Sequence, residues 1–310
     1  PHKSLIDYYK EWYNPELMSV VAVGDFDASE IESLVHKHFN EIPGFATNKK
    51  RVIYGVPDHK ERLYTITGDK EVTTTSLTIV HKRPVLKANT REEYKNALVL
   101  NLISGMLNER LFDLSKKVDA PFLEGGGYTT GLSYDKGAFV LYMTPKENMV
   151  DSAFFLLNLE AERMKQFGFT ADEYMRSLEN MNAGMDNYFK EKDNQYSNGI
   201  VNAILDQVIN DAIYTDIETG YTIYKEIIPT ISLEEVNQVA KSLTTDSNSV
   251  VMISYPEKEG IKIPSETALE KIYSEVKKTK ISSPTVATTD RPLIKVEPVP
   301  GKIIKEEDFG

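Results

Sequence analysis

Residues 11–27 read EWYNPELMSVVAVGDFD, a stretch typical of the end of a folded domain. Asn14-Pro15 ends a preceding helix, because the residue before a proline is held in an extended conformation. The apolar run that follows is rich in β-branched residues and predicts a strand buried on both faces. Asp27 and Glu30 then form an Asp-x-x-Glu cap for a further helix. The opening of the chain therefore predicts a helix, a turn, a strand and a helix.

The same order of elements recurs near the other end of the chain. SLIDYYKEWYNPELMSVVAVGD from Ser4 and SLEEVNQVAKSLTTDSNSVVMISY from Ser232 share a Ser-Leu opening, an acidic first turn, an amphipathic helix and an S-V-V strand. The second stretch is longer in its turn. Their spacing predicts a duplicated domain of about 230 residues. We expect the second copy to be whole and the first to be present only as its closing part, with most of it outside this chain.

Composition bounds the class of protein. The chain has 310 residues, of which 41% are hydrophobic and 27% charged, as in a soluble globular protein of about two domains. The net charge of -11 argues against broad binding of nucleic acid or anionic lipid. No apolar run is long enough to predict a transmembrane segment. The absence of cysteine excludes disulfides, thiolate metal sites and a cysteine nucleophile.

Between the two copies, the patterns predict a mixed α and β domain. Strands are expected at RLYTITG, TTTSLTIVHKRP and NSVVMISYP, and in two halves of EGGGYTTGLSYDKGAFVLYMTP. Thr90 and Glu93 cap a long helix that is apolar over much of its surface and is therefore central. Further helices are expected at roughly 147–167, 171–192, 196–212, 218–227 and 232–243.

The chain changes character after Pro256, where prolines are scattered among polar residues around one short helical stretch, ALEKIYSEVKK. This composition is typical of a linker. We therefore predict a domain remnant at residues 1–44, a connection at 45–60, a second domain at 61–257 and a hinge or linker arm at 258–310.

Two stretches resemble a known family. Residues 8–43 closely resemble the end of the catalytic domain of insulinase/pitrilysin-type zinc metallopeptidases, the inverzincins. LNLISGMLNERLFDLSKK, residues 100–117, is similar to the Leu-Gly-Gly-x-x-Ser-x-Arg-Leu-Phe helix of that family. The resemblance identifies 61–257 with the family's non-catalytic second domain, and the tail with the hinge between the halves of its long members.

The resemblance implies a fold and an activity for the longer protein. The fold class is α+β, with an antiparallel-dominated sheet and helices packed on one face, a LuxS/insulinase-like metallopeptidase domain preceded by a partial copy of itself. Two such halves would enclose a peptide-cleaving chamber. Zinc would be held by an H-x-x-E-H motif and a distant glutamate, with the motif's glutamate as general base.

The chain departs from that pattern where the chemistry would lie. Its histidines are His2, His36, His38, His59 and His81, and none forms an H-x-x-E-H or H-E-x-x-H motif. We therefore predict no catalytic residue, no metal ligand and no cofactor in this chain, with zinc only in the longer protein. The substrate-holding Arg and Tyr of active members fall, by position, at Lys116 and near Phe122–Leu123, so neither residue type is kept.

Other possible sites have simpler explanations. His36 and His38 point apart on a helix, as one surface and one partly buried histidine. Asp27 is better explained as a helix cap than as half of a catalytic pair with Asp25.

Two further stretches also have structural explanations. The glycines of EGGGY precede a strand, the wrong context for a phosphate loop, and predict a bulge or close backbone approach at an edge strand that could bind peptides. Glu160, Glu162 and Arg163 are expected on a solvated helix surface.

The leading hypothesis is a non-catalytic portion of a zinc-dependent peptidase, inactive by itself, that forms part of the chamber wall. The alternative is a catalytically dead family member that acts as an assembly or peptide-binding subunit. A third is a stand-alone peptide-binding module. Expected partners are the missing remainder of the chain and a peptide or unfolded polypeptide, with a dimer through exposed apolar surface as a further option. Location is unknown, although the resemblance implies a periplasmic or otherwise extracytoplasmic parent.

Overall fold

The computed structural model describes residues 2–42, 44, 52–284, 299, 301–302 and 305–306. Its elements, in chain order, are α1 (His2–Trp12), the 3₁₀ turn η1 (Pro15–Leu17), α2 (Ala28–Phe39), β1 (Leu63–Asp69), β2 (Ser76–Pro84), α3 (Arg91–Ser115), β3 (Phe122–Gly131), β4 (Lys136–Pro145), α4 (Val150–Phe167), α5 (Ala171–Lys190), η2 (Lys192–Asn194), α6 (Ser197–Asn210), α7 (Ile217–Ile227), η3 (Ile228–Thr230), α8 (Leu233–Leu243), β5 (Ser249–Pro256) and α9 (Glu266–Lys278). Within these described ranges, none of the helices has both the length and the apolar character needed to cross a membrane.

The five strands form one sheet in the order β1-β5-β2-β4-β3. β2 pairs antiparallel with β4 and β5, and β3 pairs antiparallel with β4, whereas β1 and β5 are parallel. Antiparallel pairing therefore dominates, as the fold class predicts. The last strand of the domain lies inside the sheet, between its first two strands.

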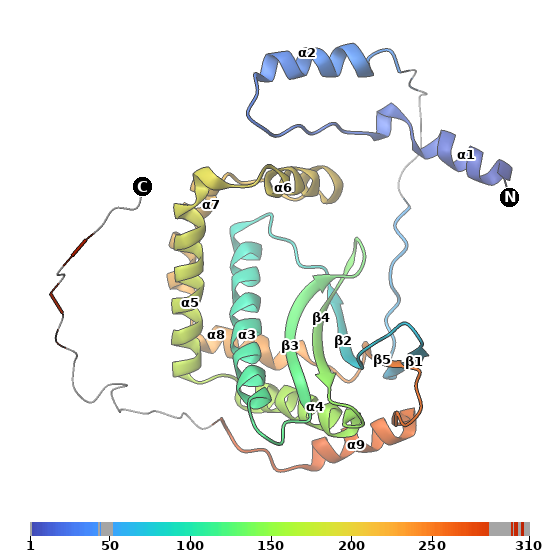
Figure 1. Ribbon diagram of the computed structural model, residues 1–310, viewed down its shortest axis with the longest axis vertical. Coiled ribbons are helices and arrows are strands. Elements are labelled where there is room, and N and C mark those ends of the chain that lie inside the picture. Colours follow the sequence, from blue (N-terminus) through green and yellow to red (C-terminus); the bar gives the residue numbers. More distant parts are fainter. Residues whose placement is uncertain are drawn as a thin grey trace.

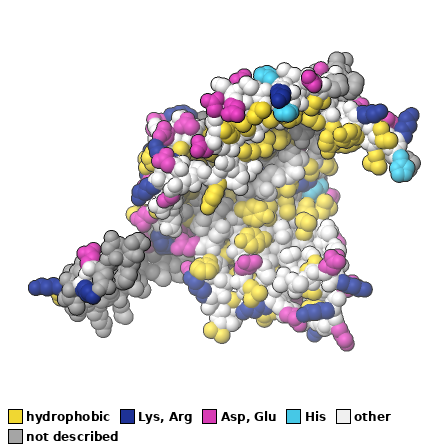
Figure 2. All heavy atoms as spheres, turned by 45° about the horizontal axis from the view of Figure 1, so that its top comes forward, with side chains coloured by type: hydrophobic (Ala, Val, Ile, Leu, Met, Phe, Trp, Pro, Cys, Tyr) yellow, Lys and Arg dark blue, Asp and Glu magenta, His cyan; other side chains and the backbone are white. Residues whose placement is uncertain are grey.

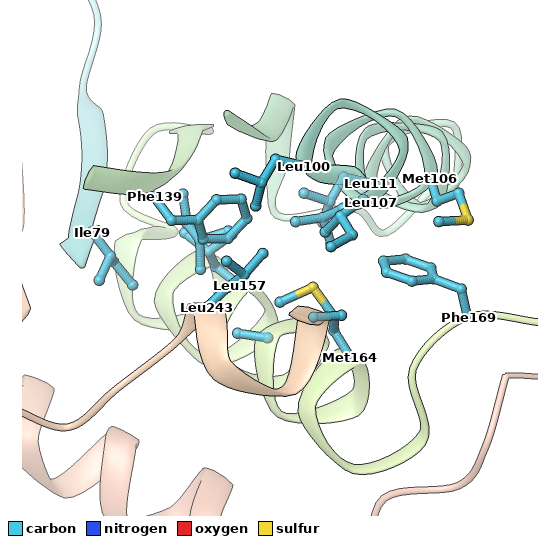
Figure 3. Close-up of a cluster of buried hydrophobic side chains, with 14 of the residues drawn as sticks. Ile79, Leu100, Met106, Leu107, Leu111, Phe139, Leu157, Met164, Phe169 and Leu243 are labelled. Carbon is cyan, nitrogen blue, oxygen red and sulfur yellow. The ribbon is translucent and has the colours of Figure 1, made fainter. Parts of the chain in front are cut away.

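Helices cover one face of this sheet (Figure 1). On that face, alternate strand residues are buried: Leu77, Ile79, Phe139, Leu141, Val251 and Ile253. Figure 3 shows Ile79 and Phe139 of the sheet pointing toward Leu107 of α3 and Leu157 of α4. The opposite face carries exposed side chains such as Met252. This one-sided burial confirms the predicted two-layer α+β arrangement.

α3 is the central helix. Thr90 and Glu93 form a reciprocal capping box at its start, as predicted. Its buried residues occupy several sides of the helix: Leu98, Val99, Leu100, Leu102, Ile103, Met106, Leu107 and Leu111. The helix packs against β3 on one side and against α5 and α8 on others. Its wide apolar surface is thus explained by contacts with both the sheet and the helix layer.

α9 packs along α4, although its sequence falls within the predicted arm. Leu269 and Val276 of α9 are fully buried, and Ile281 beyond it is nearly so. The prediction that Glu160, Glu162 and Arg163 lie on a solvated surface is wrong. Glu160 is 2% exposed and pairs with Arg163, while Glu162 pairs with Lys277 of α9 at 2.5 Å. The acidic face of α4 is covered because the helix after β5 folds back onto it.

The first 42 residues lie apart from this body (Figure 1). Asp27 caps α2 by accepting a hydrogen bond from the Glu30 backbone N–H at 2.9 Å, as predicted. The predicted buried strand within residues 18–26 is wrong, because this stretch pairs with no strand among the described residues and Val20 is 52% exposed. Figure 2 shows hydrophobic side chains running along this segment and recurring on the body below it.

Candidate functional site

Among the described residues β3 pairs only with β4, so it forms an open edge of the sheet. The EGGGY stretch forms its first half, and the register shifts between Phe122 and Glu124, which marks an irregularity or bulge. The edge strand and the bulge agree with the prediction made for these glycines. An edge strand offers backbone N–H and C=O groups to another extended chain.

The glycines allow α3 and β4 to approach the strand closely. A Cβ atom at Gly127 would lie 2.8 Å from Leu107 Cδ2 of α3, on the core side. A Cβ atom at Gly126 would lie 2.9 Å from Cε1 of Tyr142, on the other face. A side chain at either position would displace its neighbour, so close packing explains why glycine is needed here.

Asn108 of α3 reaches this edge. Its Oδ1 accepts a hydrogen bond from the Gly127 N–H at 2.7 Å. Because the Gly127 N–H bonds to Asn108, the backbone N–H and C=O of Gly127 point away from β4, toward the open edge. In an antiparallel pair these directions alternate along the strand, so the backbone groups of Gly125 and Thr129 also point toward the open edge. The edge is therefore partly satisfied by a side chain at its centre and open on both sides of it.

Aromatic and apolar side chains surround the edge on the face without helices. Tyr128 is 46% exposed, and its ring centroid lies 5.9 Å from that of Tyr142. Leu123 is 60% exposed at the start of the strand. Glu124 accepts a hydrogen bond from the Thr144 hydroxyl at 3.1 Å. An extended chain laid along β3 would meet a surface that is apolar, with one carboxylate near the bulge.

The Arg-Leu-Phe stretch of α3 has a structural role. Arg110 pairs with Glu173 at the start of α5 and donates to the Gly168 carbonyl at 2.8 Å. Its guanidinium also lies 4.5 Å from the centre of the Phe169 ring. Burial alone would raise the pKa of Glu173, but hydrogen bonds from Arg110 and Thr170 outweigh burial and hold that pKa below its usual value. This buried pair joins α3 to the α4–α5 corner.

The positions compared with the substrate-holding pair lack that chemistry. Lys116 is exposed and is bonded to Asp113 at 3.1 Å, with its ammonium over the Phe112 ring. Phe122 is fully buried. Leu123 is exposed but has no polar group.

No group of three or more His, Asp or Glu side chains in the described part of the chain is placed to hold a metal ion. His36 and His38 are both exposed on α2, so the expectation that one is partly buried is wrong. Asp25 is exposed and Asp27 serves as the helix cap. The residues present do not fit the family's zinc site.

Sequence reasoning located the glycine edge but missed Asn108 and Tyr142. Both residues are polar positions within apolar stretches, which gives no direct signal of where their side chains point. Asn108 is exposed on α3, so its place in the sequence gives no signal that its amide reaches the backbone of the neighbouring strand.

Known proteins match this architecture. A sequence model described as the peptidase M16 inactive domain matches residues 1–181, more than half of the chain. The zinc protease PQQL-like protein of Arabidopsis thaliana is 21% identical over 310 residues, which is all of this chain and 30% of the relative. The chain spans less than a third of the length of the curated relatives it matches.

Solved structures share the fold. The periplasmic protease PqqL from Escherichia coli superimposes with a TM-score of 0.82 at 16% identity, over 94% of this chain and 32% of that one. A predicted insulinase family protease from Yersinia pestis gives 0.75 at 15% identity, over 88% of this chain and 58% of that one. With its glycine edge, its one-sided sheet and the match over residues 1–181, the chain belongs to the peptidase M16 family, where it corresponds to the domain described as inactive.

Proposed function

We propose that this chain is a non-catalytic part of a zinc-dependent peptidase, in which it lines the peptide-binding chamber and binds substrate along the outer edge of β3. The open edge beside Tyr128 and Leu123 carries this proposal. A peptide that adds as a strand gains backbone hydrogen bonds without requiring a particular sequence. Such binding suits a domain that orients substrates and leaves cleavage to another part of the protein.

The geometry limits where the peptide would pair. Asn108 already occupies the Gly127 N–H, so the added strand would pair first with the backbone on the Gly125 side. There the exposed Leu123 side chain can contact alternate residues of the peptide. The peptide would extend the sheet beyond β3, and every second side chain would lie on the face without helices, the face of Tyr128.

Zinc would be bound elsewhere in the longer protein. The relatives are named zinc proteases, while the described residues here offer no metal site. Side-by-side assays of zinc content and peptide hydrolysis test this division. We expect the longer protein to bind zinc and cleave, and this chain to do neither. Loss of both from the longer protein would favour a dead assembly subunit instead.

We propose the peptide partner and an extracytoplasmic location from the similarity of this chain to known proteases. The E. coli structure is described as a periplasmic protease, and the relatives as proteases. Fractionation of cells that make the longer protein would test the location.

Strand addition can be tested with N-methylated peptides on the 310-residue chain. The probe is a short fluorescein-labelled peptide rich in valine and threonine, made in two forms methylated at alternate residues. The form whose methyl groups face β3 should bind about tenfold more weakly or worse, since each lost backbone hydrogen bond is worth about 1 kcal/mol. The other form should bind like the parent peptide.

A matched pair of variants checks the location. Tyr128→Ser should weaken binding of the unmethylated peptide, because the ring flanks the edge. Tyr196→Ser should not, since Tyr196 is 85% exposed on a different part of the surface. Equal binding of the two methylated forms would contradict strand addition at any edge.

A further inference from the structure

A cavity of about 510 Å³ lies at one end of the sheet. It is bounded by the loop after β2, by the turn between β3 and β4, and by the end of α6. Its lining includes Val85, Leu86, Leu100 and Ile213, which are apolar, together with Arg83. The volume falls in the range of about 300–1,000 Å³ that is typical of small-molecule sites.

Arg83 is the unusual member of this lining. It follows Ile79 and His81 on the helix-covered face of β2, and its partner across the strands is Gly137, which has no side chain that could pair with it. The Nη1 atom is buried without a hydrogen-bond partner. Burial lowers the pKa of the Arg83 guanidinium, and no acidic neighbour opposes that effect. The side chain as a whole is half-buried, and it is the inner Nη1 atom that is shielded from water without an acceptor, which is costly.

The acidic groups nearby are engaged with other partners. Asp206, in the lining, accepts a hydrogen bond from Asn210 Nδ2 at 2.7 Å. Asp211 accepts one from the Tyr134 hydroxyl at 3.2 Å. Lys87 adds a second basic side chain to the lining. The cavity therefore offers an arginine without an acidic partner, in a lining that mixes apolar side chains with polar ones such as Thr129, Ser133 and Asp206.

We propose that this cavity binds a carboxylate whose apolar body fills the space beneath the β3–β4 turn. The fork of a guanidinium matches a carboxylate with two parallel hydrogen bonds. Asp206 in the same lining offsets part of the charge of Arg83 and Lys87, and this small positive balance suits a monoanion better than a phosphate dianion. The chemical class is a short apolar peptide with a free C-terminal carboxylate. This site is separate from strand addition at Gly125, and either can fail without the other.

Isothermal titration of the 310-residue chain tests the proposal with two matched probes. N-acetyl-leucyl-phenylalanine carries the free carboxylate, and its C-terminal amide lacks the charge. We expect the acid to bind about tenfold more tightly than the amide or better, and more tightly than inorganic phosphate. Arg83→Gln should reduce affinity for the acid to that for the amide.

Arg91→Gln is the control variant. Arg91 is a surface arginine on α3 that pairs with Glu226, so its loss should leave binding of the acid unchanged. A thermal unfolding curve of Arg83→Gln shows whether the variant folds. If the variant does not fold, the proposal is tested by the comparison of acid with amide on the unaltered chain. The proposal is overturned if the acid does not bind, or if it binds no more tightly than the amide or less tightly than phosphate. It is also overturned if a folded Arg83→Gln binds the acid as the unaltered chain does.

Discussion

The two copies of the helix–turn–strand unit differ in what surrounds them. In the second copy, Ser232 caps α8, and Val251 of β5 is fully buried between neighbouring strands and helices. In the first copy, the matching strand residue is Val21, which lies in an unpaired extended stretch. The half-buried positions Val21 and Val23 alternate with exposed ones, as Val251 and Ile253 do in the folded copy.

The difference shows that the local sequence pattern determines which side chains alternate in exposure, but does not by itself form a β-strand. Both copies begin the apolar run with Ser-Val-Val, and both place their less exposed side chains at alternate positions. Only the second has strands on either side to accept its hydrogen bonds, from β1 and β2. A strand exists when a neighbour completes its backbone bonding. Stability should therefore depend on the second copy and hardly at all on the first.

The largest effect should come from a charge placed in each strand. Val251→Asp would bury a carboxylate in the core and lower the free energy of unfolding by about 5 kcal/mol or more, enough to prevent folding. Val21→Asp should change it by no more than about 0.5 kcal/mol. Urea unfolding followed by near-ultraviolet circular dichroism measures both. Similar losses in the two variants would show that the first copy is packed against the body in solution.

A smaller, pH-dependent effect should distinguish the turns. The longer turn of the second copy contacts His81 of β2, whose Nδ1 lies 3.1 Å from the carbonyl oxygen of Thr245 in that turn. Burial, aided by the nearby charge of Arg62, lowers the pKa of His81 to about 4. The His81 imidazole is protonated below about pH 6.5 in the unfolded chain but only below about 4 in the folded chain. Its contribution to the free energy of unfolding is therefore fully present above about pH 6.5 and is lost as the pH falls toward about 4.

The loss should approach about 3 kcal/mol across that window. Stability curves against pH for the unaltered chain and for His81→Gln give the measurement, and their difference isolates this group because carboxylates such as Glu173 titrate in both. His36→Gln, an exposed histidine beside the first copy, should leave the curve unchanged. If the two curves have the same slope between about pH 6.5 and 4, so that their difference is flat, the assignment to His81 is refuted.

The smallest effect should come from the helix caps. Ser232→Ala removes the acceptor for the Glu235 N–H and should cost about 1 kcal/mol of global stability. Asp27→Ala removes the same kind of bond from α2 and should leave global unfolding unchanged. Its loss would instead appear as faster amide exchange in the first turn of α2. Equal shifts in global unfolding from the two variants would show that α2 unfolds together with the second domain.

Local signals gave most of the second domain in advance. The capping box at Thr90 and the alternation in β2 each depend on neighbours along the chain. The glycines of β3 marked a close approach, because only the absence of a side chain explains three in a row within a strand. The sequence predicts the edge strand itself, but not that the side chains of Asn108 and Tyr142 contact it.

Features that depend on distant residues could not be predicted. The burial of Glu160 requires α9, which lies more than a hundred residues later and has a helix's pattern but no signal of where it docks. The parallel pairing of Leu63 with Val250 leaves no trace in either strand. The lack of a partner for Arg83 is visible only once Gly137 lies opposite it. Charge counts say nothing about which cations are paired.

The place of β5 in the sheet also sets when this domain can be finished during its synthesis. β5 is the last strand to leave the ribosome, yet it lies between β1 and β2. Until it emerges, β1 has no hydrogen-bonding neighbour and one edge of β2 stays bare, so the nascent chain carries two open strand edges while the intervening helices are made. Any nascent chain stalled before Ser249 would therefore display an unfinished sheet, a form that chaperones and proteases recognise.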